Sequence, residues 1–128
     1  MKVLVIDDEK VVLDSCRKIL CSEGFDVVPV SSVDDALALL ENESFPLLLI
    51  DIKMPRHDGL YLMNLLREHG VLIPMVVMSG YTTDETMDKA KSMGATAFLP
   101  KPFTPDELIE TVRQAIGGGA PLTAPLPS

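Results

Sequence analysis

Short apolar runs recur along this chain, and longer segments with helical spacing separate them. Three of the runs, at 3–6, 47–50 and 75–78, are apolar at every position and do not alternate with polar residues. Continuous apolarity is typical of strands that are buried on both faces of a sheet. The pattern predicts five strands, at residues 2–7, 26–30, 46–51, 73–79 and 95–99.

The segments between these runs place apolar residues three and four positions apart, as amphipathic helices do. The expected inward-facing positions of the first three helices are Val12, Cys16, Ile19 and Leu20, then Val33, Ala36, Leu37 and Leu40, then Leu62, Leu65 and Leu66. We therefore expect a helix after each of the first three strands.

The last two helices differ in how clearly the sequence marks them. The fifth begins with Thr104 as a natural N-cap, Pro105 at the first helical position and Glu107 where a capping box requires it. The fourth, at about residues 83–93, offers only Met87, Ala90 and Met93 to a core. We expect this fourth helix to be weakly held.

Strands that alternate with helices pair in parallel through right-handed crossovers, and the helices then cover both faces of the sheet. The predicted fold is therefore α/β and doubly wound, with a five-stranded parallel sheet and five helices. Residues 1–116 form the expected domain. Residues 117–128 begin with three glycines, contain three prolines and carry no charge, which is typical of a flexible tail or linker.

Composition and charge narrow the class of protein. The 128 residues are 47% hydrophobic and 23% charged, as in ordinary globular domains, and the net charge is −8. This charge disfavours direct binding to nucleic acid. The sequence contains no apolar run long enough to cross a bilayer and no secretory signal, so we expect a cytoplasmic protein. Cys16 and Cys21 lack the partners of a zinc site or a disulfide framework.

Chemically active side chains follow the predicted strands. Asp7 and Asp8 come after the first, Asp51 ends the third, Ser79 ends the fourth and Lys101 follows the fifth. In doubly wound sheets, ligands bind at the carboxyl ends of the strands. Carboxylates crowded there repel one another unless a cation lies among them, and an all-oxygen ligand set suits Mg²⁺ better than zinc.

All of these residues except Asp51, whose carboxylate would be costly to bury unpaired, also have a simpler structural interpretation. Asp7 and Asp8 could cap the first helix, because Asp is a favoured N-cap. Ser79 could be an ordinary turn residue before Gly80. Lys101 before Pro102 could simply lead out of a strand. Only the combination of all of them at one sheet edge favours a functional site.

Four motifs together resemble the receiver domain of bacterial two-component response regulators, a family that includes the chemotaxis regulators. The motifs are the acidic pair Asp7-Asp8, the segment Asp51-Ile52-Lys53-Met54-Pro55-Arg56-His57-Asp58-Gly59, the dipeptide Ser79-Gly80 and the segment Lys101-Pro102-Phe103. The resemblance covers residues 2 to about 116. It implies a flavodoxin-like sheet with strand order 2-1-3-4-5, counted along the chain.

The resemblance implies a role for each residue of the metal site. Asp51 matches the phosphoacceptor, which takes a phosphoryl group from a partner histidine kinase. Asp7 and Asp8 match the acidic pair that holds Mg²⁺ together with Asp51. Lys53 stands where a backbone carbonyl completes the protein ligands of the metal.

The remaining motif residues match the family's response to phosphorylation. Ser79 matches the hydroxyl that bonds a phosphoryl oxygen, and Lys101 matches the cation that pairs with another, directed by a cis bond to Pro102. Phe98 matches the switch aromatic, which rotates inward after transfer. The face made by the fourth helix, fifth strand and fifth helix, within residues 80–108, is then the expected output surface.

The implied function is a phosphorylation-activated signalling switch that catalyses only its own phosphorylation and slow dephosphorylation. Its expected partners are a sensor histidine kinase or phosphotransfer protein, an output domain after residue 128, and a second copy bound through the output surface. One alternative is a metal-dependent phosphatase or hydrolase with Asp51 as nucleophile, which Lys53 disfavours because such enzymes usually have a second acidic residue there. Another is a degenerate receiver that acts as a docking scaffold.

Overall fold

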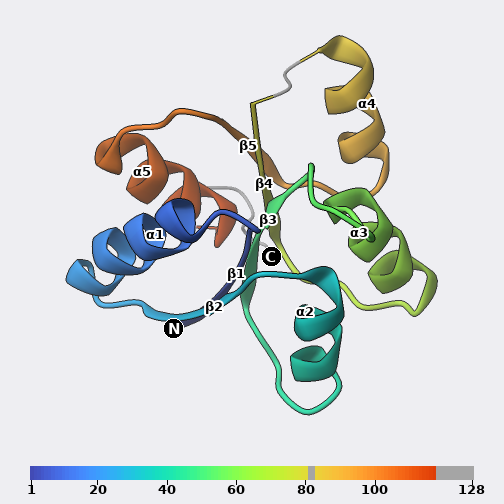
Figure 1. The fold of residues 1–128 in the computed structure, drawn as a ribbon, viewed down its shortest axis with the longest axis horizontal. Helices are drawn as coiled ribbons and strands as arrows, with labels where there is room; N and C mark the ends of the chain where they lie inside the picture. Colours follow the sequence, from blue (N-terminus) through green and yellow to red (C-terminus); the bar gives the residue numbers. More distant parts are fainter. Residues whose placement is uncertain (81–82, 118–128) are drawn as a thin grey trace.

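The computed structural model describes residues 1–80 and 83–117 and forms an α/β sandwich of three layers (Figure 1). The strands are β1 (Lys2–Ile6), β2 (Asp26–Val30), β3 (Leu47–Asp51), β4 (Met75–Ser79) and β5 (Ala97–Pro100). The helices are α1 (Lys10–Ser22), α2 (Val33–Leu40), α3 (Gly59–Glu68), α4 (Asp84–Ser92) and α5 (Pro105–Ala115). All ten predicted elements are present, so the class and element order expected from the sequence are confirmed.

The strands form one parallel sheet in the order β2-β1-β3-β4-β5, as expected. Helices α1 and α5 cover one face of the sheet, and α2, α3 and α4 cover the other (Figure 1). Side chains alternate between these two cores along each strand. In β1, for example, Val3 and Val5 pack towards α1 and α5, whereas Leu4 and Ile6 pack towards α2 and α3. This two-sided burial explains the continuously apolar strands.

Several details differ from the sequence prediction, among them the bounds of β5, which spans Ala97–Pro100 and not residues 95–99. Strand β4 begins at Met75 and not at residue 73, because Pro74 has no amide hydrogen to contribute to a sheet ladder. Helix α3 buries Met63 completely, while Leu65 is only partly buried. The face of α3 that packs on the sheet is therefore rotated about the helix axis, towards Met63 and away from Leu65, relative to the predicted face.

The helix ends agree with the sequence signals. Thr104 and Glu107 form the predicted capping box at the start of α5, with bonds of 3.1 and 2.8 Å. Helix α4 buries only Ala90, as expected for a weakly held element. The predicted tail lies outside the described residues, except for Gly117.

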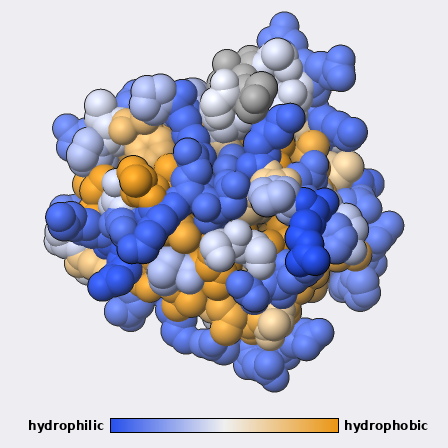
Figure 2. Space-filling view, viewed as in Figure 1, coloured by the Kyte–Doolittle hydropathy of each residue, from blue (hydrophilic) through white to orange (hydrophobic). Residues whose placement is uncertain are grey.

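On the face drawn in Figure 2, hydrophilic residues line most of the outline, and apolar residues gather at the left and in the lower part of the view. Within the described ranges, no helix has both the length and the apolar character that crossing a bilayer requires.

The two cysteines differ sharply in accessibility. Cys16 is a fully buried residue of α1. Burial, with a smaller contribution from the nearby Asp7 carboxylate, raises the pKa of its thiol to about 12. Cys21 lies exposed on the same helix. We predict that iodoacetamide at pH 8 modifies one cysteine of the native protein, Cys21. The raised pKa lowers the thiolate fraction of Cys16, and this alone should slow its alkylation roughly a thousandfold relative to an ordinary thiol.

Mass spectrometry of the alkylated peptides checks this prediction. Denaturation in urea should expose both thiols to the reagent at similar rates. Modification of Cys16 in the native protein as fast as Cys21 would show that α1 does not seal this part of the core.

Candidate functional site

The carboxyl ends of four strands bring the predicted residues together at one edge of the sheet. Asp7 follows β1, Asp51 ends the adjacent β3, Ser79 ends β4, and Lys101 follows β5. Parallel pairing of β1 with β3 and of β3 with β4 places these chain positions side by side. The sequence-predicted site therefore assembles at the place where ligands bind in doubly wound sheets.

Three carboxylates form a tight cluster. One oxygen from each of Asp7, Asp8 and Asp51 lies within 4.8 Å of the other two. Asp7 is fully buried and Asp51 is 4% exposed, whereas Asp8 is exposed to solvent. The cluster is thus anchored inside the protein and open on the side of Asp8.

The helix-capping interpretation of the acidic pair is wrong. Helix α1 has Glu9 as its N-cap residue and shows no side-chain cap hydrogen bond. The Asp7 carboxylate instead accepts a hydrogen bond of 2.9 Å from the Glu9 amide. This bond turns the chain after β1 and leaves the other Asp7 oxygen facing Lys101.

Lys101 reaches into the acidic cluster. Its ammonium Nζ lies 2.7 Å from Asp7 Oδ2, 3.2 Å from Glu9 Oε1 and 3.3 Å from Asp51 Oδ2. Its backbone amide donates to the Ser79 carbonyl at 2.9 Å, and the peptide bond to Pro102 is cis, as the resemblance implied. Burial by itself would lower the pKa of Lys101, but the bond to Asp7 and the charge of Asp51 more than offset it and raise the pKa.

The environment of Asp51 disfavours the charged form of its carboxyl. Burial raises the pKa of its carboxyl from 3.8 to about 6, and the negative charge of Asp7 adds to the shift. Lys101 and the Lys53 amide, which donates to Asp51 Oδ1 at 3.3 Å, lower it only in part. One ammonium is therefore not enough to neutralise the cluster.

The donor set fits a hard divalent cation. All three clustered groups are carboxylates, and the described residues supply no histidine or cysteine to this cluster. Oxygen ligands of this kind suit Mg²⁺, and a second positive charge would relieve the repulsion that Lys101 leaves.

Ser79 and Phe98 line the same small cavity at the ends of β4 and β5. Ser79 is 6% exposed at the end of β4, and Phe98 is half-buried on the adjacent β5. Both line a small cavity of about 10 Å³, together with Met87 of α4. A change at Ser79 can therefore be transmitted through packing to β5 and α4.

Hydrogen bonds at both ends of the loop between β3 and α3 hold it near Asp51, one to Asp51 itself and one to the adjacent Ile52. The Lys53 amide donates to the Asp51 carboxylate, and the Gly59 amide donates to the Ile52 carbonyl at 3.0 Å. Asp58 caps α3 by accepting from the Tyr61 amide at 2.9 Å. The position of the Lys53 backbone is thus coupled to that of Asp51.

Sequence reasoning missed two features of the site. The sequence patterns assign no role to Glu9, yet its carboxylate contacts Lys101. They also indicate no partner for His57, yet it contacts Asp34, which lies 23 residues earlier. The position of Glu9, two residues after Asp7, was a usable signal, whereas no local pattern links His57 to Asp34.

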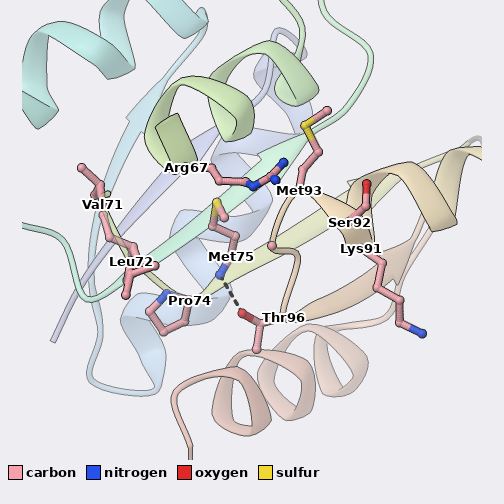
Figure 3. A pocket seen from close by; sticks show the side chains of 11 residues that line it. Arg67, Val71, Leu72, Pro74, Met75, Lys91, Ser92, Met93 and Thr96 are labelled. Atoms are coloured by element: carbon pink, nitrogen blue, oxygen red, sulfur yellow. Dashed lines mark hydrogen bonds between the residues drawn. The ribbon is translucent and has the colours of Figure 1, made fainter. Parts of the chain in front are cut away.

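A larger groove lies elsewhere on the molecule. It has a volume of about 500 Å³ and is bordered by the ends of α3 and α4 (Figure 3). Arg67 extends across it towards Met93, and Leu72, which is 92% exposed, lies at its side. None of the clustered carboxylates lines this groove, so it is separate from the candidate site.

Comparison with known proteins identifies a family and several relatives. The family model described as the response regulator receiver domain matches residues 3–113. The hydrogenase transcriptional regulatory protein HoxA of Cupriavidus necator is 39% identical over 115 residues, which cover 89% of this chain and 24% of HoxA. The chain thus spans about a quarter of that relative.

Solved structures agree with the sequence matches. The receiver domain of the Francisella response regulator 1452 superposes with a TM-score of 0.85 at 30% identity, covering 90% of this chain and 95% of that one. A CheY-like receiver domain protein from Methanospirillum hungatei gives a TM-score of 0.84 at 31% identity, covering 90% and 92%.

Proposed function

Because this chain belongs to the response regulator receiver family of two-component systems, we propose that it is a signalling switch phosphorylated on Asp51. One observation carries the proposal: the nearly buried Asp51 carboxylate lies against Asp7, Asp8 and the Lys101 ammonium. This combination supplies a nucleophile, a set of metal ligands and a fixed cation. Receiver domains generally bind Mg²⁺ at such an acidic pocket.

Phosphoryl transfer requires little from the protein beyond positioning and charge neutralisation. An Asp51 oxygen attacks phosphorus and forms the acyl phosphate bond. The bond from phosphorus to the donor breaks, and its electron pair leaves with the donor group. An ionised carboxylate needs no general base, which accounts for the lack of a histidine in the described carboxylate cluster.

We assign the metal ligands to Asp7, Asp8, Asp51 and the backbone carbonyl of Lys53. Mg²⁺ held there would neutralise charge on the transferred phosphoryl group. Lys101 is already placed 3.3 Å from Asp51, so its ammonium can pair with a phosphoryl oxygen after transfer. Transfer of Lys101 from Asp7 to the new phosphoryl oxygens is part of the proposed activation.

The proposed switch uses Ser79 and Phe98. The Ser79 hydroxyl moves to bond a phosphoryl oxygen, and Phe98 turns inward as the packing around their shared cavity changes. Helix α4 buries only Ala90, so little packing opposes its movement. The face of α4, β5 and α5 is therefore the proposed output surface.

Receiver domains act with histidine kinases and output domains, and we propose the same setting for this chain. The donor would be a sensor kinase or phosphotransfer protein in the cytoplasm, and an output domain would follow residue 128. HoxA, a transcriptional regulator by name, is about four times as long as the region it shares with this chain. A homodimer through the output surface would link phosphorylation to assembly. The net charge of −8 opposes direct nucleic-acid binding by this segment.

Two alternatives make different predictions. A hydrolase or phosphatase with Asp51 as nucleophile would turn over an added phosphate ester many times. A degenerate receiver used only for docking would accept no phosphate. The intact set of Asp7, Asp8, Asp51, Ser79 and Lys101 disfavours the second alternative, and Lys53 two residues after Asp51 disfavours the first.

Incubation of the protein with acetyl phosphate and Mg²⁺ tests the proposal. We expect one phosphate per chain, stable in acid and labile in base, that peptide mass spectrometry maps to Asp51. Chelation of Mg²⁺ should prevent incorporation. Sustained release of many equivalents from a phosphate ester would favour the hydrolase, and absence of any incorporation would favour the docking scaffold.

A further inference from the structure

The β3–α3 loop has an unfavourable backbone conformation at Arg56. Its φ angle of +68° lies in the left-handed region, which a residue with a side chain adopts only when its surroundings impose it. The hydrogen bonds of Lys53 and Gly59 fix the two ends of the loop but do not reach its middle. Another contact must hold the segment around Arg56.

His57 supplies that contact. Its Nδ1 atom lies 3.0 Å from Asp34 Oδ1, and its ring stacks on Tyr61 with centroids 4.0 Å apart and planes 8° from parallel. Asp34 belongs to the first turn of α2, whereas Tyr61 belongs to the first turn of α3. His57 therefore ties the middle of the loop to two helices on the same face of the sheet.

These contacts join the loop to the first turns of two capped helices. Helix α2 follows β2 and is fixed by Ser32, which accepts from the Asp35 amide at 3.1 Å. Tyr61 is fixed by the Asp58 cap of α3. The side chains of His57 and Asp34 are 43% and 54% exposed, so their contact adds little to global stability. Its main effect is on the shape of the loop.

We propose that His57 is a positioning residue for the metal site. Its contacts with Asp34 and Tyr61 keep the β3–α3 loop in the conformation that holds the Lys53 backbone against the Asp51 carboxylate. This inference rests on the proposed function, because it assumes that the Lys53 carbonyl binds Mg²⁺. It adds a residue outside the acidic cluster that sets the affinity of that cluster for the metal.

His57→Ala, which removes both contacts, is the main test variant. Calorimetric titration with MgCl₂ alone, without phosphodonor, should show a dissociation constant about fivefold higher than in the unchanged protein, the size of one partly exposed contact. In the metal-free protein, hydrogen exchange of the Lys53 and Gly59 amides should accelerate by a similar factor. The urea midpoint should stay nearly unchanged, which separates positioning from a structural role.

Two conservative variants separate the contribution of the contact with Asp34 from that of the stack on Tyr61. In His57→Asn, the amide nitrogen takes the place of Nδ1 and keeps the bond to Asp34, whereas His57→Phe keeps the stack on Tyr61. Each should recover part of the lost Mg²⁺ affinity. Because both fill the position with a side chain, they also keep the test valid if His57→Ala folds poorly.

Asp34→Ala gives the independent check, with Asp35→Ala as its matched control in the same first turn of α2. Asp34→Ala should weaken Mg²⁺ binding alone but add little to His57→Ala, whereas Asp35→Ala should leave Mg²⁺ affinity unchanged. Unchanged affinity in all His57 variants, or full additivity with Asp34→Ala, would overturn the inference while leaving phosphorylation of Asp51 intact. Failure of the unchanged protein to bind Mg²⁺ would overturn both the proposed metal site and the inference about His57.

Discussion

Replacement of Asp51 by asparagine is expected to make the metal-free protein more stable while removing its ability to accept phosphate. Asp51→Asn removes the proposed nucleophile, so phosphate incorporation from acetyl phosphate should fall to background. The same change removes a carboxylate that is buried against Asp7. We expect the free energy of unfolding at pH 7, in the presence of a chelator, to rise by about 2 kcal/mol.

The sign and pH range follow from the raised pKa. In the unfolded chain the Asp51 carboxyl has a pKa of 3.8, and in the folded protein burial, followed by the charge of Asp7, raises it to about 6. The folded state therefore holds a proton more tightly, and stability is lost as the pH rises from about 4 to 6. The full shift, which already includes the opposing attraction of Lys101, corresponds to roughly 3 kcal/mol and sets an upper limit on the gain in the variant.

Urea unfolding at several pH values measures this effect. The difference between Asp51→Asn and the unchanged protein should be largest at pH 7 and should shrink as the pH falls below 6. Asp8→Asn, at the exposed member of the same cluster, serves as the control and should change stability by less than about 0.5 kcal/mol. Saturating Mg²⁺ should stabilise the unchanged protein more than Asp51→Asn. A loss of stability in Asp51→Asn at pH 7 would contradict the conclusion that the charged Asp51 carboxylate destabilises the metal-free fold.

Much of the fold could be predicted because its signals are local. Continuous apolar runs such as Leu47–Ile50 mark strands buried on both sides, and Thr104 with Glu107 marks a helix start within four residues. These inferences needed only periodicity and capping. The convergence of Asp7 with Asp51 required in addition that the first and third strands be neighbours, an order that the family resemblance implied and that the structure shows.

The rest of the site depends on distances that no local pattern encodes. The sequence placed Lys101 near the carboxylates, but its closer approach to Asp7 than to Asp51 depends on the path of the chain through Pro102. The contact of His57 with Asp34 joins the β3–α3 loop to the first turn of α2, which lies 23 residues earlier in the chain. No local pattern indicates that Gly59 lies against the Asp51 backbone, because the packing of α3 on β3 sets that contact.

Replacement of Gly59 by alanine is expected to damage both stability and phosphate acceptance. A Cβ atom at this position would lie 2.4 Å from the Asp51 carbonyl oxygen and 2.7 Å from Cγ2 of Ile50. Both contacts are far shorter than van der Waals distance, so α3 must move away from β3. We expect Gly59→Ala to lower the free energy of unfolding by about 3 kcal/mol, although alanine is the better helix former.

The damage should also reach the site, because the clashing carbonyl belongs to the phosphoacceptor itself. A displacement of about 1 Å at a reacting group can cost on the order of a hundredfold in rate. We expect the initial rate of phosphate incorporation in Gly59→Ala to fall at least tenfold under conditions in which the variant remains folded. Urea unfolding and peptide mass spectrometry measure the two effects separately.

Gly80→Ala provides the matched control, because an added Cβ there would meet no described atom within 4 Å. Its stability should stay within about 0.5 kcal/mol of the unchanged protein. The double variant Ile50→Ala with Gly59→Ala separates the two clashes. Removal of the Ile50 side chain relieves only the longer contact, while the Asp51 carbonyl oxygen is backbone and cannot turn aside. Because loss of the buried Ile50 side chain costs stability by itself, the double variant is compared with Ile50→Ala alone. Adding Gly59→Ala should cost nearly as much in that background, and a much smaller cost would show that side-chain crowding, not the phosphoacceptor backbone, requires glycine at this position.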